Sequence, residues 1–337
     1  MHFLLRIMTN FNFTNDWLAG FIEADGSFVV SFEDKANGIP VRPRPILNLT
    51  QSKVEYEMFK ALQEYLGVGR VQTNRDNVTL VISSTKELVE VIIPILDKYT
   101  LQGNKFITYQ IFRQVCLMMY NKEHLTLEGT LKILELAYFM NKDTSLRTEE
   151  TKEVLLNKLR SKNSSLPTNY KPELPEARES SPMSLEFIRG LVEGDGSFNI
   201  GFRTDRRRIS VNFTVVLELA SISLLHELVK YFNCGNVYTL KSNAARYQVQ
   251  NLDDFITKVL PILRDVKFNT IKQTHFEIFA QVCQHIHTNG YKTDKDLKFI
   301  VDLAWDMNNN AKRRRVTKDE YLDLFINTSP TPFGGCK

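Results

Sequence analysis

The sequence predicts an α+β protein built from two copies of one αββαββα unit. Three observations support this fold class. Two pairs of segments repeat along the chain: residues 17–28 (WLAGFIEADGSF) match 187–198 (FIRGLVEGDGSF), and residues 94–116 match 261–283. Apolar residues in each copy follow helical spacing in some stretches and alternate in others. A proline-rich segment separates the copies. A repeat of this length predicts two similar units, each with its own core.

The boundaries of the copies follow from these matches. We expect an N-terminal subdomain at residues 11–160, a linker at 161–183, a C-terminal subdomain at 184–316 and a flexible tail at 317–337. The linker contains four prolines and many polar residues, which favour an extended chain over a packed element. With 337 residues, 43% of them hydrophobic, the chain is long enough for two ordinary cores.

The elements of each copy can be placed in order. Residues 16–24 have helical spacing, and Phe28, Val30 and Phe32 alternate with more polar neighbours, so a helix runs straight into a strand. In the first copy we then expect strands at 46–50, 70–73 and 78–82 and helices at 54–66, 85–96 and 106–120. In the second copy we expect strands at 198–203, 209–216, 236–240 and 247–250. Strands joined by short turns and flanked by helices are typical of an α+β fold.

Composition excludes several classes of protein. No run of eighteen apolar residues occurs, and residues 1–8 are too short for a secretory signal, so we expect an intracellular, soluble protein with no membrane partner. The four cysteines lack the spacing of a zinc site or a disulfide framework. A net charge of +4 permits a nucleic-acid partner without requiring one.

Small residues lie four positions apart in the first helix of each copy. Gly20 and Ala24 hold these positions in one helix, and Gly190 and Gly194 hold them in the other. Side chains this small let two helix backbones approach closely. Because the chain carries two such helices, the simplest partner of the first is the second, across a pseudo-two-fold axis. This packing would bring the two helix ends together.

An aspartate followed by glycine closes each of these helices, at Asp25 and at Asp195. Glycine after a helix predicts a left-handed turn that stops it. Carbonyl oxygens at a helix C-terminus favour a cation beside a carboxylate, and such hard-oxygen donors suit magnesium. A single Asp-Gly pair is an ordinary turn, but two copies at corresponding places favour a site. Because the two strands of duplex DNA approach closely across the minor groove, one acid could serve each strand.

The segments LAGFIEADGSF at 18–28 and IRGLVEGDGSF at 188–198 resemble the LAGLIDADG homing endonuclease family. The resemblance extends from about Asp16 to Asn310, and residues 112–129 are similar to the organellar, intron-encoded, single-chain branch. It implies a monomeric, metal-dependent endonuclease that cuts one phosphodiester on each strand of a specific duplex DNA, across the minor groove, and leaves short 3′ overhangs. By analogy it also implies a mitochondrion or another organelle.

The resemblance assigns roles to individual residues. The metal ligands would be Asp25 and Asp195 with the backbone carbonyls of Ala24 and Gly194, and the catalytic residues would be the two acids with Lys105 and Lys272. Asn48 and Thr214 align with a water-positioning polar group. The implied cofactor is Mg²⁺, with Mn²⁺ as the alternative and Ca²⁺ supporting binding without turnover.

Two departures from the family pattern stand out. Arg189 replaces an expected alanine, and Glu23 and Glu193 occupy a position where aspartate is commoner. Two interpretations of Arg189 stay open: it points away from the helix crossing, or it gives the two halves different roles. We expect Glu23 and Glu193 to be structural rather than catalytic.

The resemblance also implies that the antiparallel sheets form a saddle in the DNA major groove, with alternate residues facing bases. The outward candidates are Ser31, Glu33, Arg42, Arg44, Arg70, Gln72, Asn199, Arg203, Asn212, Lys241, Arg246 and Gln248. The two halves differ at these positions, so we expect a long and asymmetric target. Two rival functions stay open. One is an RNA-binding intron maturase whose partner is the host intron RNA; the other is a descendant that binds without cutting.

Overall fold

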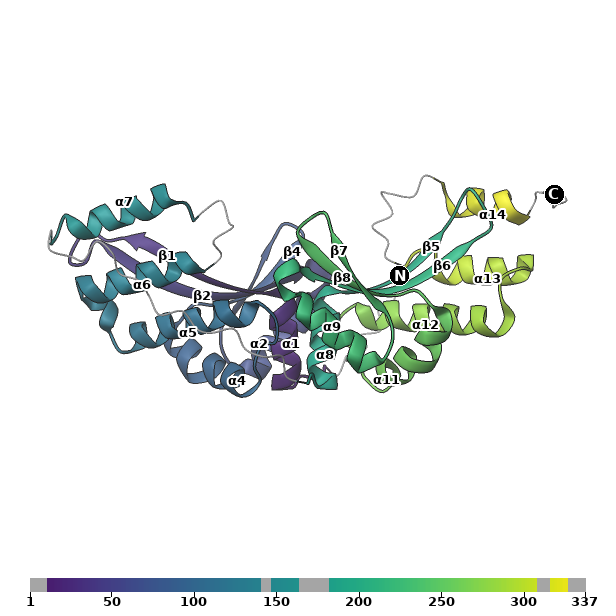
Figure 1. The fold of residues 1–337 in the computed structure, drawn as a ribbon, viewed down its shortest axis with the longest axis horizontal. Coiled ribbons are helices and arrows are strands. Elements are labelled where there is room, and N and C mark those ends of the chain that lie inside the picture. Colours follow the sequence, from purple (N-terminus) through teal and green to yellow (C-terminus); the bar gives the residue numbers. More distant parts are fainter. Residues whose placement is uncertain (1–10, 141–146, 164–181, 308–315, 327–337) are drawn as a thin grey trace, which may run out of the picture. The chain divides into compact units, whose positions relative to one another are not determined.

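The computed structural model describes residues 11–140, 147–163, 182–307 and 316–326 (Figure 1). The chain divides into two compact units. The first comprises Met1–Asp195 with Ala220–Leu224, and the second comprises Gly196–Leu219 with Leu225–Lys337. Most of the predicted linker, residues 164–181, and the end of the predicted tail, residues 327–337, lie outside the described residues. No helix in the described part is long and apolar enough to cross a membrane.

The first unit contains a four-stranded antiparallel sheet. Its strands are β1 (Gly26–Asp34), β2 (Val41–Ser52), β3 (Arg70–Asn74) and β4 (Asn77–Ile82), in the spatial order β1-β2-β4-β3. Helix α1 (Asn15–Asp25) runs directly into β1, as predicted. Thr14 caps the start of α1, because its hydroxyl accepts a hydrogen bond from the backbone N–H of Trp17 at 3.0 Å.

Helices cover one face of this sheet. They are α2 (Tyr56–Leu66), α3 (Thr85–Glu87), α4 (Ile93–Lys98), α5 (Lys105–Tyr120) and α6 (Leu127–Phe139), with α7 (Glu149–Arg160) and α8 (Leu185–Asp195) following along the chain. Phe28 on β1 packs 5.0 Å from Phe112 and 5.6 Å from Tyr109, measured between ring centroids. These α5 rings join the helices to the sheet. A π-helical turn (Leu88–Ile92) interrupts the helix predicted at 85–96, since Pro94 near the start of α4 lacks the N–H of a regular turn.

Strand β2 is longer than predicted. It begins at Val41 and includes Pro43 and Pro45. Strand β4 pairs with β2 only from Leu47 onward. The β2 residues before Leu47 therefore pair with β1 on one side and with no described strand on the other. Proline is tolerated in a strand where its missing N–H has no partner to serve. The two prolines therefore stop the β2–β4 pairing without ending the strand.

The second sheet repeats the first. Its strands are β5 (Gly196–Phe202), β6 (Ile209–Glu218), β7 (Asn236–Leu240) and β8 (Ala244–Val249), in the order β5-β6-β8-β7. The helices of this copy are α9 (Ile222–Phe232), α10 (Leu252–Asp254), α11 (Leu260–Arg264), α12 (Lys272–Asn289), α13 (Asp294–Ala304) and α14 (Lys318–Ile326). A π-helical turn, Phe255–Val259, again precedes a proline-containing helix. The predicted α+β class with two αββαββα copies is confirmed.

Helix α14 lies within the segment predicted as a flexible tail, so that prediction was wrong for residues 318–326. Tyr321 is fully buried, and its ring lies 5.4 Å from the rings of Phe202 and Trp305. The burial of these aromatic rings stabilises a helix that is too short to show clear periodicity in the sequence.

Helices α1 and α8, which both belong to the first unit, pack backbone against backbone. A Cβ atom added to Gly20 would lie 1.9 Å from the carbonyl oxygen of Phe187, and one added to Gly190 would lie 2.1 Å from that of Trp17. Neither position has room for any side chain. The predicted packing through small residues is therefore confirmed.

Gly26 ends α1 in a different way from the one predicted. Its φ of −74° and ψ of 139° are extended, not left-handed. Glycine is needed here because an added Cβ would lie 2.5 Å from the carbonyl oxygen of Ile22. The constraint is close packing against the preceding turn, and it lets Asp25 stand as the last helical residue before β1.

We expect Gly190→Ala to lower the free energy of unfolding by about 2 kcal/mol or more, because the clash is with backbone atoms that cannot rotate away. Chemical denaturation followed by circular dichroism measures this change. Gly201→Ala is the matched control. Its added Cβ would meet only the Ser210 hydroxyl, at 2.6 Å, and that side chain can move. Equal stability of the two variants would contradict the packing argument.

Candidate active site

Asp25 is the half-buried last residue of α1, where α1 and α8 meet. The side-chain amide of Gln51, on β2, donates a hydrogen bond to Oδ2 of Asp25. A Cβ atom added to Gly194, near the end of α8, would lie 2.7 Å from the same oxygen. The carboxylate of one helix therefore lies directly against the last turn of the other.

Lys105 brings a positive charge to the same place. It is the first residue of α5, and its Nζ donates to the carbonyl oxygens of Ala24, at 2.9 Å, and Ile22, at 3.1 Å. These are carbonyls of the last turn of α1, where a cation interacts favourably with the helix dipole. The structure thus brings together Asp25, the Ala24 carbonyl and Lys105, three groups to which the family resemblance assigns roles.

Glu23 has a structural role at this site. It is 4% exposed, and its carboxylate accepts hydrogen bonds from the backbone N–H groups of Gln102, at 2.8 Å, and Gly103, at 3.0 Å. An added Cβ on Gly103 would lie 2.5 Å from Glu23 Oε1. These bonds hold the loop that leads into α5, and hence they position Lys105.

The second motif ends in the same way. Asp195 is the half-buried last residue of α8, and Gly194 precedes it. The adjacent Glu193 is 1% exposed and accepts a hydrogen bond from Nε1 of Trp17 at 2.9 Å, so it too is structural. In the second unit, Lys272 is the first residue of α12, the element position that Lys105 holds at the start of α5.

Sequence reasoning missed Gln51. The available signal was a polar residue on the inward-facing side of β2, in step with the buried Leu47 and Leu49. The predicted water-positioning residues lie on the other face, where Asn48 pairs with Ser27 and Thr214 pairs with Ser197. By register, the second sheet has the buried Leu217 where the first has Gln51. The two copies therefore differ close to the motif.

The residues predicted to face DNA are spread over both sheets and their turns. Arg42, Arg70, Gln72, Asn199, Arg203 and Lys241 are exposed, whereas Ser31, Glu33, Arg44, Asn212 and Arg246 are half-buried. Arg44 forms an ion pair with Glu33, and this hydrogen bond lowers the pKa of the Glu33 carboxyl. Gln248 is 8% exposed and donates to Asn212 Oδ1 at 2.9 Å, so it presents a bonded pair rather than a free side chain.

Arg189 is fully buried between the two motif helices. It pairs with Glu186 at 2.7 Å and with Glu193 at 3.5 Å, and it donates to the carbonyl oxygen of Asn12 at 2.7 Å. Its guanidinium also lies 5.6 Å from the ring centre of Trp17, on α1. The interpretation that Arg189 points away from the helix crossing was wrong, because its contacts reach the partner helix.

This chain is similar to several known proteins. The family model described as LAGLIDADG endonuclease matches residues 18–116 and 188–283. A probable intron-encoded DNA endonuclease 1 of Mycosarcoma maydis is 42% identical over 269 residues, 79% of this chain and 97% of that protein. A probable intron-encoded endonuclease 2 of Neurospora crassa is 26% identical over 85% of this chain and 63% of its own length.

Among solved structures, the I-SmaMI LAGLIDADG homing endonuclease bound to cleaved DNA has a similar fold. Its TM-score is 0.77 at 24% identity, over 90% of this chain and 99% of that one. This similarity supports the two-copy architecture.

We expect Arg189→Met to lower the free energy of unfolding by about 3–5 kcal/mol, because Glu193 would stay buried without its cation. Adding Glu193→Gln should recover part of that loss. Arg113→Met is the control, since Arg113 forms an exposed pair with Asp97 at 2.9 Å, and we expect it to cost less than about 1 kcal/mol. Denaturant titrations measure all four proteins. A loss for Arg189→Met no larger than for Arg113→Met would contradict the buried-pair assignment.

Proposed function

Because this chain belongs to the LAGLIDADG endonuclease family, we propose that it is a site-specific homing endonuclease acting on duplex DNA. It hydrolyses one phosphodiester on each strand across the minor groove and leaves short 3′ overhangs. One observation carries the proposal: two duplicated helices end in an aspartate, and Gly194 of one helix lies against the Asp25 carboxylate of the other. Paired acids on a pseudo-two-fold axis match the two strands of the duplex.

The proposed metal ligands are the carboxylates of Asp25 and Asp195 and the carbonyl oxygens of Ala24 and Gly194. Among the described residues, no group of three or more His, Cys, Asp or Glu side chains could hold a metal ion. Mg²⁺ is commonly held by one or two carboxylates, with water and substrate phosphate as the other ligands, and Asp25 and Asp195 would offer such carboxylates. Mn²⁺ is the alternative ion. When bound, the metal supplies activation of water and neutralisation of phosphoryl charge.

Residues of the protein orient the Asp25 carboxylate and place positive charge near the reacting phosphodiester. The hydrogen bond from Gln51 orients the Asp25 carboxylate, so less reorganisation is needed when the phosphate arrives. Lys105, held at the last turn of α1, places a cation where negative charge develops during phosphodiester cleavage. We assign Lys272 the same role in the second copy. Asn48 and Thr214, on the outward faces of the sheets, order water near the cut.

Both sheets present their outward residues to the major groove, forming the two halves of a DNA-binding saddle. The copies differ in these residues, so the target is long and asymmetric, and one chain acts as a monomer. The names of the relatives support an intron-encoded gene, and we place the protein in a mitochondrion or another organelle.

Incubation with pooled intron-lacking junction DNAs and Mg²⁺ tests the function directly. A defined double-strand break separates an endonuclease from a maturase or a binding-only descendant.

Asp25→Asn should reduce double-strand cleavage by roughly a hundredfold or more, because an anionic ligand is lost while the shape of the side chain is kept. DNA affinity should change little. Gel assays of nicked and linear product measure cleavage on each strand. Asp195→Asn should behave in the same way, with any residual nicking on the opposite strand.

Glu64→Gln, an exposed acid-to-amide change on α2, is the matched control for this pair and should cut normally. Normal double-strand cutting by either aspartate variant would contradict the assignment of Asp25 and Asp195 as catalytic metal ligands. Loss of DNA binding as well as cutting would mean that the acids serve mainly the structure.

Calcium should support DNA binding but not cleavage, because its larger and more flexible ligand shell positions and activates water poorly. Gel shifts and cleavage assays in Ca²⁺, Mg²⁺ and Mn²⁺ on one duplex check this. Cleavage in calcium alone at the magnesium rate would contradict the proposed metal chemistry.

A further inference from the structure

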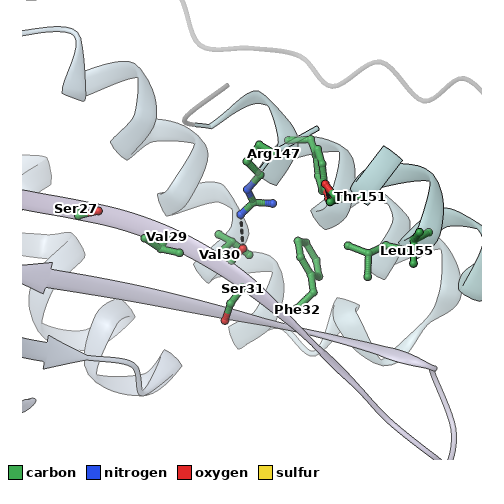
Figure 2. A pocket seen from close by; sticks show the side chains of 10 residues that line it. Ser27, Val29, Val30, Ser31, Phe32, Arg147, Thr151 and Leu155 are labelled. Atoms are coloured by element: carbon green, nitrogen blue, oxygen red, sulfur yellow. Dashed lines mark hydrogen bonds between the residues drawn. The ribbon is translucent and has the colours of Figure 1, made fainter. Parts of the chain in front are cut away.

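A pocket of about 620 Å³ lies in the first unit between α7 and the edge strand β1 (Figure 2). Ser27, Val29 and Ser31 of β1 line it on one side, and Arg147, Val154 and Leu155 line it on the other. Helix α7 is tied to the end of β1, because Nζ of Lys158 lies 2.6 Å from Asp34 Oδ1. The pocket is therefore a built feature of this unit, and we call it the α7 pocket.

The guanidinium of Arg147 is held in place inside the α7 pocket. It donates to the carbonyl oxygen of Val30 on the open edge of β1 (Figure 2). It also lies 4.9 Å from the ring centre of Tyr138 and 5.7 Å from that of Phe32. Burial lowers the pKa of this guanidinium below its ordinary value. The side chain is thus preorganised and partly stripped of water.

No carboxylate neutralises Arg147 among the residues that the structure describes. Two other charged groups of α7 are paired: Lys152 with Glu135 at 2.7 Å, and Glu153 with Arg160 at 3.3 Å. The first turn of α7 also carries Glu149 and Glu150, and a hydrogen bond with Thr148 lowers the pKa of the Glu150 carboxyl. Helical spacing puts Glu153 on the side of α7 away from Thr151 and Val154, which share the face of Arg147. A desolvated arginine without an acidic partner favours an anionic ligand.

The position of the α7 pocket indicates which anion. Its β1 side chains alternate with the buried Phe28 and Val30, so they share the outward face of the sheet. Ser31 pairs in register with Arg44, and both are proposed to face DNA. A duplex lying on this face would meet the start of α7, where Arg147 bonds to Val30 of β1.

We infer that the α7 pocket receives one sugar-phosphate unit of the target DNA backbone, with its phosphate on Arg147 and its deoxyribose against Val29 and Val154. This inference rests on the proposed function, because it requires duplex DNA on the outward face of the first sheet. The contact fixes the position of the duplex and carries no base information. It is a positioning contact at the flank of one half of the target.

Arg147→Gln tests the inference in an equilibrium binding assay with Ca²⁺ present. The probe is an intact duplex whose sequence is first identified as the one that the wild-type protein cuts among pooled intron-lacking junction DNAs. We expect affinity to fall about tenfold. We also expect the slope of log K against log salt to lose about one unit, the value for one phosphate contact. Arg160→Gln is the control: it also removes one positive charge, at the far end of α7, where Arg160 is already paired with Glu153 at 3.3 Å. It should leave both quantities nearly unchanged.

A second variant keeps the test valid if Arg147→Gln folds poorly. Val154 is 55% exposed at the pocket, so Val154→Glu adds a negative charge without breaking the bonds of Arg147. We expect it to weaken binding by a similar factor, with thermal unfolding unchanged.

Neutral methylphosphonate linkages, placed one at a time along the flank of the duplex, locate the contact. The wild-type protein should lose about tenfold in affinity at one linkage, and Arg147→Gln should lose nothing further there. Equal salt slopes for Arg147→Gln and Arg160→Gln, or full sensitivity of Arg147→Gln at every linkage, would overturn the inference while leaving the proposed endonuclease activity intact. A wild-type protein that binds no junction duplex would overturn the proposed function itself.

Discussion

The backbone contact between α1 and α8 is the constraint on which the rest of the structure depends. Gly20 faces the carbonyl of Phe187, and Gly190 faces that of Trp17, at separations that exclude a Cβ atom. Each of the two helices runs directly into the first strand of a sheet, α1 into β1 and α8 into β5. An acid at the end of such a helix has its position determined by the main chain, which cannot be repacked as a side chain can.

The charges at the helix ends are arranged around that contact. The Glu23 carboxylate binds backbone N–H groups of the loop before α5 and so stabilises the structure, whereas the Asp25 carboxylate accepts a hydrogen bond from the side chain of Gln51. Lys105 reaches the site because this loop is held, and its ammonium neutralises the carbonyl end of α1. Two neighbouring carboxylates in one motif thus have different roles, and their hydrogen-bond partners decide which is which.

The two copies share one fold but differ in the motif helix and in the strand next to it. Arg189 fills the place of a small residue and bonds with Glu186, Glu193 and the chain before α1, which the first motif does not do. Gln51 has an apolar counterpart, Leu217, in the second sheet. Duplication within one chain allows such changes, because each copy needs to fit only the other copy and not an identical one.

The sequence by itself determined the repeat, the α+β class and the two acids. These follow from local patterns: identical motifs in both copies, helical and alternating spacing of apolar residues, and small residues four apart. Only the tertiary structure decided the contact of Gln51 with Asp25, the buried network of Arg189, the docking of α14 through Tyr321 and the α7 pocket. Each of these joins residues far apart in the chain. Their energies depend on burial and on the partner that burial provides, and no local pattern encodes either.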